Sequence, residues 1–188
     1  MSKLADHYLI TPAPEDEGVF LATLERSLQQ GITLMQLRAK NLDSIAYSAL
    51  ASKVVALAHR YACRVLLNAS ADVVEAVGAD GVHLDSGRLA QCQERPLDKT
   101  QLVAASCHTL DELKKAERIQ ADFALLSPVK YTKSHPDAAP LGWQRFSEMA
   151  AQVSVPVFAL GGVSAKDREV ALQSGAQGLA GIRGYWVV

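Results

Sequence analysis

Short apolar runs alternate with longer amphipathic stretches along the chain. Apolar runs bounded by turn residues are typical of buried parallel strands, and the stretches between them carry the period of helices that pack on a sheet. The pattern predicts strands at residues 7–11, 33–38, 64–68, 81–84, 102–106, 123–127, 156–160 and 178–182. Helices are expected at 15–30, 43–61, 71–77, 88–93, 110–120, 143–152 and 165–174, with the eighth helix missing. Eight such units favour an α/β fold, a single (β/α)8 TIM barrel domain over residues 1–188.

Several helix boundaries have recognisable signals. A Ser or Thr three residues before an acidic side chain predicts a capping box, and a glycine after the last turn takes the left-handed conformation at little cost. The boxes are Thr109 with Glu112 and Ser164 with Asp167, and the glycines are Gly31 and Gly175. Residues 128–142 hold three prolines and no helical period, so a long loop is expected after the sixth strand.

Composition narrows the classes of function. With 19 Lys and Arg against 20 Asp and Glu, the chain lacks the basic excess typical of nucleic-acid binding. Cys63, Cys92 and Cys107 form no C-x-x-C pair, so neither a disulfide framework nor a zinc site is indicated. No secretion signal is recognisable, and no apolar run approaches the ~20 residues of a membrane span. We expect a cytoplasmic protein with a small-molecule partner and no nucleic-acid or membrane partner.

Residues at the carboxyl ends of the strands are the first candidates for function, because the loops of such a barrel converge there on one mouth. Alternation after the second strand sends Gln36, Arg38 and Lys40 to one side and Leu37 and Ala39 to the other. Two cations and an amide then face the mouth. The same cations would also suit a merely solvated strand end, and this alternative stays open at this point.

Two glycine turns follow the seventh and eighth strands. Gly161 and Gly162 let the backbone approach a ligand, and the next helix presents unpaired amides at its start. Gly181 and Ile182 end the eighth strand, and the loops after strands seven and eight are the recurrent phosphate site of such barrels. We expect a phosphate or pyrophosphate ligand here, although the first turn would also serve as a plain connection into a helix.

Several motifs, taken in order, resemble a known family. They are Tyr8–Thr11, Gln36–Lys40, Ala79–Leu84, Ser106–Thr109 and Leu160–Val163. The chain is similar over residues 8–182 to thiamin phosphate synthase and its relative TenI. Its sixth loop, with Ser127–Val129 ahead of Ser134–Pro136 and Leu141–Trp143, most resembles the synthase-like domains found fused to Nudix hydrolases. Sugar-phosphate epimerases share the glycine turns but not the other motifs.

The resemblance implies roles for several of these residues. Gln36, Arg38 and Lys40 would face an aminopyrimidine with its pyrophosphate, Ser106 would line the pyrimidine site, and the glycine turns would hold a thiazole phosphate. Synthases of the family join these two ligands with loss of pyrophosphate, using magnesium. Further candidates at the mouth are Asn68, His83, His108 and Thr132.

The chain departs from the family pattern at the metal. An Asn-Asp pair closes the third strand of synthases, but this chain has Asn68 and Ala69. A second acidic ligand follows the fourth strand in synthases, and Arg88 stands at that position. Asp72 and Asp85 are the nearby candidates for replacing the lost ligands, although a cation beside them opposes Mg²⁺.

The sixth loop departs as well. Where synthases carry a pyrophosphate-binding lysine, this chain has His135, and Lys130 or Lys133 would have to supply the charge. A histidine side chain has a reference pKa near neutrality, so His135 suits acid or base catalysis, and it equally suits a structural turn. The catalytic histidine of the TenI tautomerase corresponds to Pro128, so that role does not carry over.

Three interpretations follow. The first is a barrel of thiamin metabolism that binds a phosphorylated thiazole, aminopyrimidine or thiamin-like ligand and has impaired synthase chemistry. The second is an active synthase, with Mg²⁺ as its cofactor. The third is a non-catalytic sensor or partner-binding barrel, suggested by the missing last helix and the apolar residues 185–188, which we expect to be exposed. This apolar end predicts a homodimer or a larger assembly.

Overall fold

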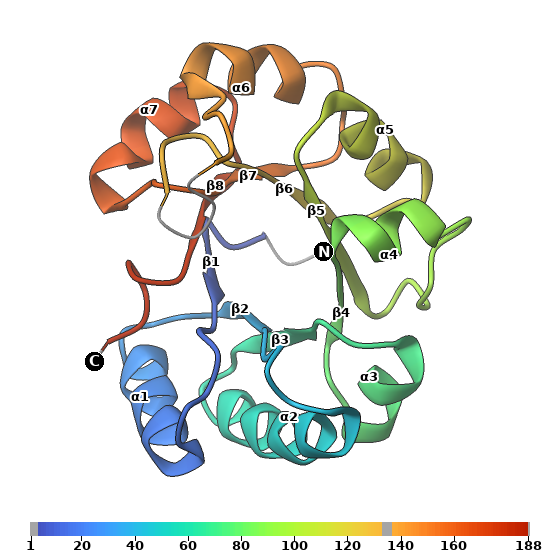
Figure 1. Cartoon of the computed structure of the whole chain (residues 1–188), viewed down its shortest axis with the longest axis vertical. Helices are drawn as coiled ribbons and strands as arrows, with labels where there is room; N and C mark the ends of the chain where they lie inside the picture. Colours follow the sequence, from blue (N-terminus) through green and yellow to red (C-terminus); the bar gives the residue numbers. More distant parts are fainter. Residues whose placement is uncertain (1–3, 133–136, 188) are drawn as a thin grey trace.

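A computed structural model describes residues 4–132 and 137–187, and Figure 1 shows a ring of helices around a closed barrel. The eight predicted strands all form, and each pairs in parallel with its neighbours until β8 closes on β1. The strands are β1 His7–Ile10, β2 Leu34–Leu37, β3 Arg64–Leu67, β4 Gly81–Leu84, β5 Leu102–Cys107, β6 Phe123–Leu126, β7 Val157–Ala159 and β8 Gly178–Gly181.

Helices follow the first seven strands and cover the outside of the barrel. They are α1 Glu17–Gln29, α2 Ser44–His59, α3 Ala71–Val77, α4 Ser86–Gln91, α5 Leu110–Arg118, α6 Gly142–Ala150 and α7 Arg168–Gln173, with the 3-10 turn η1 Ala165–Asp167 before α7. Both predicted capping boxes form. The predicted helix at 88–93 begins earlier, because the Asp85 carboxylate accepts the Arg88 N–H at 3.0 Å and caps α4. No helix among the described residues is long and apolar enough to cross a membrane.

Apolar side chains fill two layers. The outer layer lies between the sheet and the helices, and the inner layer lies within the barrel. Tyr8, Phe123 and Phe158 meet in the inner layer, where the Tyr8 and Phe123 ring centroids are 5.1 Å apart. These three side chains have no exposed surface. They close the barrel below its mouth.

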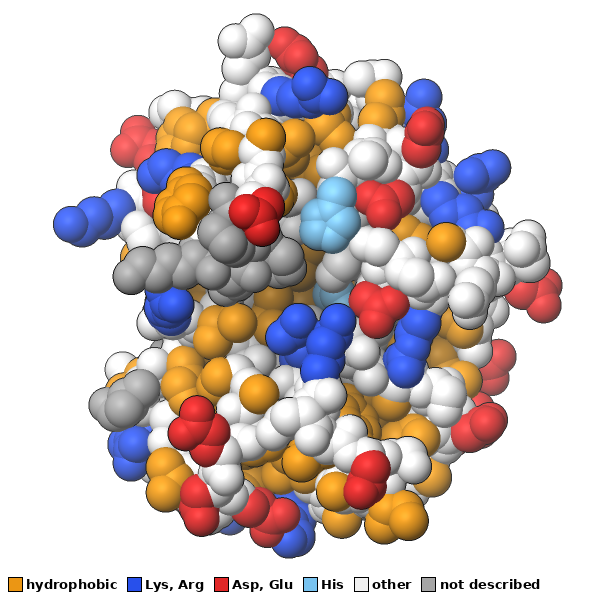
Figure 2. Space-filling model, in the orientation of Figure 1, with side chains coloured by type: hydrophobic (Ala, Val, Ile, Leu, Met, Phe, Trp, Pro, Cys, Tyr) orange, Lys and Arg blue, Asp and Glu red, His pale blue; other side chains and the backbone are white. Residues whose placement is uncertain are grey.

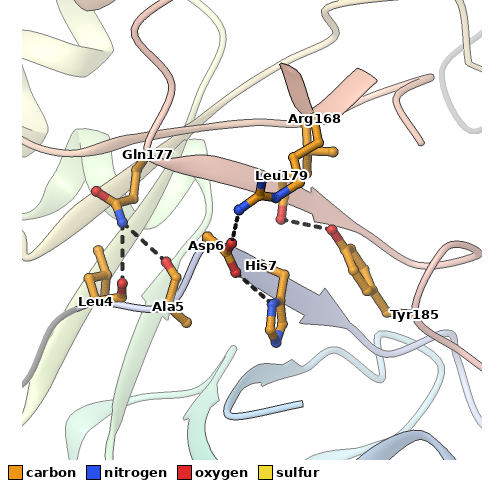
Figure 3. A network of polar contacts seen from close by, with 8 residues as sticks. All are labelled: Leu4, Ala5, Asp6, His7, Arg168, Gln177, Leu179 and Tyr185. Atoms are coloured by element: carbon orange, nitrogen blue, oxygen red, sulfur yellow. Dashed lines mark hydrogen bonds and ion pairs between the residues drawn. The ribbon is translucent and has the colours of Figure 1, made fainter. Parts of the chain in front are cut away.

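Hydrogen bonds hold the amino-terminal segment at the end of the barrel opposite the strand carboxyl termini (Figure 3). The Gln177 amide donates to the carbonyls of Leu4 and Ala5 at 3.3 and 3.2 Å. Asp6 accepts from the Arg168 guanidinium at 2.6 Å and contacts the His7 ring at 2.9 Å. Its pKa is lowered chiefly by the hydrogen bond from Arg168. These contacts tie β1 to β8 and α7 at the end of the barrel away from the strand carboxyl termini.

The expectation of an exposed apolar end is wrong for Tyr185 and Trp186, which are partly buried. The Trp186 ring packs on Phe20 with centroids 5.0 Å apart, and the Tyr185 hydroxyl donates to the Leu179 carbonyl at 3.4 Å. The Val187 N–H donates to the Ser27 hydroxyl at 2.9 Å. No described residue after β8 is helical. Instead of a helix, this C-terminal segment covers the flank between α7 and α1 (Figure 1).

Candidate functional site

A cavity of about 1080 Å³ opens at the carboxyl ends of the strands. Figure 2 looks onto this face and shows Lys and Arg side chains gathered near the centre of the view. Most of the residues singled out from the sequence line the cavity: Gln36, Arg38, Lys40, Asn68, Asp85, Ser106, His108, Thr132, Gly161, Gly162, Gly181 and Ile182. Lys133 and His135 lie outside the described residues. The barrel therefore brings side chains from distant parts of the sequence to one mouth.

The end of β2 presents its side chains as alternation predicts. Gln36, Arg38 and Lys40 line the cavity, whereas Leu37 and Ala39 are buried in the outer apolar layer. Gln36 is only 2% exposed, so its amide lies deep in the mouth, and Lys40 at the rim is exposed. The Arg38 N–H donates to the buried Thr11 hydroxyl at 2.9 Å, which ties the strand end to β1. The end of β2 therefore places a polar amide deep in the mouth and a cation at its rim.

His83 lies deeper than predicted. It is 1% exposed and does not line the cavity, because on the inward face of β4 it sits below the mouth. Its Nδ1 lies 3.1 Å from the Tyr8 hydroxyl, and its Nε2 lies 2.8 Å from the Ser106 hydroxyl. Burial lowers the pKa of His83 to about 3, so the ring is neutral at physiological pH. His83 therefore supports Ser106, and Ser106 is the member of the pair that reaches the cavity.

His108 takes the position at the rim that was also predicted for His83. It is exposed, and its Nδ1 lies 2.9 Å from the Ser127 carbonyl oxygen. A carbonyl oxygen only accepts hydrogen bonds, so the proton of a neutral His108 ring is on Nδ1 and Nε2 is an acceptor. Nε2 has no hydrogen-bond partner in the part of the chain that the structure describes, so it can accept a hydrogen bond from a ligand.

The turn after β7 requires its glycines for a reason that the sequence did not reveal. Gly161 and Gly162 have φ of 92° and 68°, and a Cβ on Gly161 would lie 2.7 Å from the Pro128 Cα. The loop after β6 packs here, with the Val129 and Lys130 N–H groups donating to the Leu160 and Gly161 carbonyls, each at 2.9 Å. The glycines thus seat one loop on another and at the same time line the cavity.

Backbone donors also gather at this side of the mouth. The N–H groups of Gly162, Val163, Arg183 and Gly184 have no acceptor among the described residues, and all four residues line the cavity. Unpaired backbone N–H groups bind phosphate oxygens well. Arg183 is a further cation here that sequence reasoning missed, although its place directly after β8 could have indicated it.

Lys130 cannot supply the charge that the resemblance required of it. Its ammonium donates to Asp167 at 2.6 Å, and Lys130 does not line the cavity. Burial would raise the pKa of Asp167, but the hydrogen bonds from Lys130 and Ser164 outweigh it and the pKa is lowered. The pair joins the loop after β6 to η1, so Lys130 has a structural role.

A smaller side cavity of about 460 Å³ adjoins the mouth between the loops after β2, β3 and β4. Lys40, Asn68 and Asp85 line both cavities. Ala69 and Arg88 line only the side cavity. Asp72 is exposed on the first turn of α3 and lines neither.

Comparison with known proteins identifies the family. A family model described as thiamine monophosphate synthase matches residues 7–185. The chain belongs to this family. A protein of Aquifex aeolicus named "Putative thiamine-phosphate synthase 2" is 38% identical over 175 residues, covering 93% of this chain and 94% of the relative. A thiamine-phosphate synthase of Methanobrevibacter smithii is 30% identical over 174 residues, covering 92% of this chain and 83% of the relative.

A solved structure extends the likeness to three dimensions. Thiamine phosphate pyrophosphorylase from Pyrococcus furiosus superposes with a TM-score of 0.78 at 26% identity, covering 94% of this chain and 85% of that one. The thiamine monophosphate synthase resemblance inferred from the sequence motifs, and the barrel fold with it, are thereby confirmed.

The magnesium ion implied by this synthase family fits the residues present poorly. Mg²⁺ prefers several oxygen ligands, usually with a carboxylate among them. Ala69 offers none, and one oxygen of Asp85 already caps α4. Among the described residues no group of three or more His, Cys, Asp and Glu side chains could hold a metal ion. Arg88 lines the same side cavity as Asp85, and its positive charge would repel a cation there.

Proposed function

We propose that this barrel of the thiamine monophosphate synthase family binds a phosphorylated thiazole, aminopyrimidine or thiamin-like ligand at its mouth. The observation that carries the proposal is that cationic side chains line one side of the cavity and glycine turns line another. Arg38 and Lys40 line the β2 side, and the glycine turns, whose Gly162 and Gly184 N–H groups have no acceptor among the described residues, line the β7 and β8 side. Gln36 and Ser106 supply hydrogen-bonding groups that suit a pyrimidine ring.

The phosphate of a thiazole ligand would bind the glycine turns, where backbone donors and Arg183 converge. A pyrophosphate on the pyrimidine would lie toward Arg38 and Lys40. We further infer that thiamin phosphate formation is slow or lost in this chain, because Ala69 and Arg88 stand where the resemblance places acidic metal ligands.

An active synthase is the second candidate. The names of the relatives favour it, and Asn68 and Asp85 both line the mouth. If this candidate holds, Mg²⁺ would be the cofactor and Asp85 its nearest carboxylate.

The test is to incubate the purified chain with aminopyrimidine pyrophosphate and thiazole phosphate, with and without Mg²⁺, and to measure thiamin phosphate. Calorimetric titration with thiazole phosphate is run in parallel. We expect saturable binding of thiazole phosphate and little or no product. Mg²⁺-dependent turnover would establish the second candidate. If the chain neither binds thiazole phosphate nor forms product, the proposed function is refuted.

A further inference from the structure

Arg88 forms no ion pair among the described residues. It lines the side cavity, yet its Nη1 is sheltered from solvent and has no hydrogen-bond acceptor among the described residues. Its backbone N–H bonds to Asp85, but no described ion pair includes its side chain. A sheltered guanidinium N–H left unpaired costs free energy, so an acceptor brought by a ligand would be favoured here.

Arg95 shows how the same chain satisfies an arginine that it uses structurally. The Arg95 side chain is 11% exposed and pairs with Asp122 at 2.8 Å. It also donates to the carbonyls of Leu97 at 3.1 Å and Gln101 at 2.6 Å. Arg88 has no comparable set of acceptors. Packing alone therefore does not account for a guanidinium at this position.

Two cations of the mouth also lack an ion pair among the described residues. Arg38 and Lys40 take part in no ion pair among the described residues, and Lys40 lines both the mouth and the side cavity. Asp43 and Asp85 are the acidic residues that line the side cavity, and each spends a carboxylate oxygen on capping a helix, on Ala46 N–H at 2.8 Å and Arg88 N–H at 3.0 Å. Neither carboxylate neutralises the guanidinium through a side-chain contact.

We propose that Arg88, with Arg38 and Lys40, forms an anion site at the edge shared by the two cavities, and that this site binds a phosphate or pyrophosphate group without a divalent cation. A guanidinium presents paired N–H donors that match phosphate oxygens, and its charge does not depend on pH in the working range. Arg88 thus supplies locally the positive charge that a metal ion would otherwise bring. The proposal rests on the proposed function only in placing this group on a ligand of the same mouth.

Inorganic pyrophosphate is the probe for the first test. The full chain is titrated by calorimetry once in EDTA and once in excess Mg²⁺, with free pyrophosphate corrected for its own Mg²⁺ binding. We expect the two Kd values to agree within about twofold, since the binding charges belong to side chains. Binding that improves tenfold or more with Mg²⁺, or no binding in either buffer, would overturn the proposal.

Two variants locate the site. Arg88→Met keeps the bulk of the side chain and is expected to weaken pyrophosphate binding about tenfold or more in both buffers, because a charge-assisted contact is lost. Arg88→Asp should abolish binding in EDTA and regain part of it in Mg²⁺. Arg145→Met, on the exposed face of α6 and in neither cavity, is the matched control and should bind as the unaltered chain does. Equal affinity for Arg88→Met and the control contradicts the assignment.

Thiazole phosphate separates this inference from the proposed function. The same samples are titrated with it, and thermal melts confirm that each variant is folded. Retained thiazole phosphate binding without pyrophosphate binding would refute the Arg88 site alone. If the unaltered chain binds neither pyrophosphate nor thiazole phosphate, the proposed function is refuted. If Arg88→Met does not fold, the pyrophosphate titrations of the unaltered chain in EDTA and in Mg²⁺ still test the proposal. Arg88→Lys then keeps the positive charge and removes the paired N–H donors of the guanidinium.

Discussion

His83 shows what a single buried residue contributes beneath the mouth. It bridges the Tyr8 and Ser106 hydroxyls in a place that water does not reach. A neutral imidazole has one donor and one acceptor nitrogen, so it donates to one of these hydroxyls and accepts from the other. The Ser106 hydroxyl at the cavity floor is therefore oriented from below. The neutrality of the ring has a measurable effect on stability.

We predict that His83 makes the protein less stable as the pH falls below about 6.5. Burial lowers the folded-state pKa of His83 to about 3 from 6.5, so between these values the unfolded chain binds a proton that the folded chain does not. The free energy of unfolding should fall by on the order of 1 kcal/mol per pH unit from this residue. Urea denaturation at pH 7, 6 and 5 measures the slope.

His83→Gln is the control for this slope, because an amide does not titrate. The variant is expected to be less stable at pH 7 and to show a shallower decline between pH 6 and 5. An identical slope in both proteins would show that other groups cause the pH dependence.

At the scale of the element, the turn after β7 has two requirements at once. Its left-handed backbone favours glycine, and its close contact with Pro128 excludes any side chain. Gly175 at the end of α7 offers a comparison, because its φ is 84° but nothing lies within 4 Å of a Cβ placed there. The two glycines separate backbone strain from steric exclusion.

We predict that Gly161→Ala is more harmful than Gly175→Ala. Left-handed strain alone should cost Gly175→Ala about 1–2 kcal/mol, and Gly161→Ala adds the displacement of the Pro128 loop. Thiazole phosphate affinity should fall in Gly161→Ala and stay unchanged in Gly175→Ala. Chemical denaturation and calorimetry on the two variants measure these effects, and equal losses of stability would contradict the packing argument.

The sequence predicted the elements better than the contacts between them. Apolar runs and alternation predicted all eight strands and the side on which Gln36 lies, because a barrel buries one face of each strand inside and the other outside. The depth of His83 below the mouth was not predictable, since it depends on the register of β4 relative to the neighbouring strands. The pairing of Lys130 with Asp167, 37 residues apart, depends on the packing of two loops, which no local pattern encodes.

At the scale of the whole molecule, the C-terminal segment takes the place of an eighth helix. Trp186 covers Phe20 of α1, and Val187 bonds to Ser27 and Arg26 of the same helix. The apolar end read from the sequence as a free surface is therefore largely used within the chain. An apolar segment can cover its own barrel or another subunit, and composition does not distinguish the two.

We predict that Trp186→Ala destabilises the whole barrel by about 1–3 kcal/mol, since a partly buried aromatic contact is lost. Ile45→Ala on α2 is the matched control, because Ile45 is 82% exposed and its truncation should cost less than about 0.5 kcal/mol. Guanidinium denaturation followed by circular dichroism compares them. Equal stability of the two variants would mean that the segment does not close this flank.

A homodimer or larger assembly stays our prediction in solution. Val19, Leu172 and Val187 are 66%, 41% and 37% exposed on α1, α7 and the C-terminal segment. The C-terminal segment lies between these two helices on one side of the ring (Figure 1). Such residues favour association. Light scattering at micromolar concentration gives the mass, and a monomer would contradict the prediction.

The aromatic layer of Tyr8, Phe123 and Phe158 has a kinetic consequence. Because these side chains close the barrel from below, every ligand arrives and departs through the same opening. A group that sits on the floor beside Gln36 must bind before one that lies above it, and must leave after it. Two ligands sharing this mouth would therefore follow a fixed order of binding and release, and an excess of the outer ligand would slow the departure of the inner one.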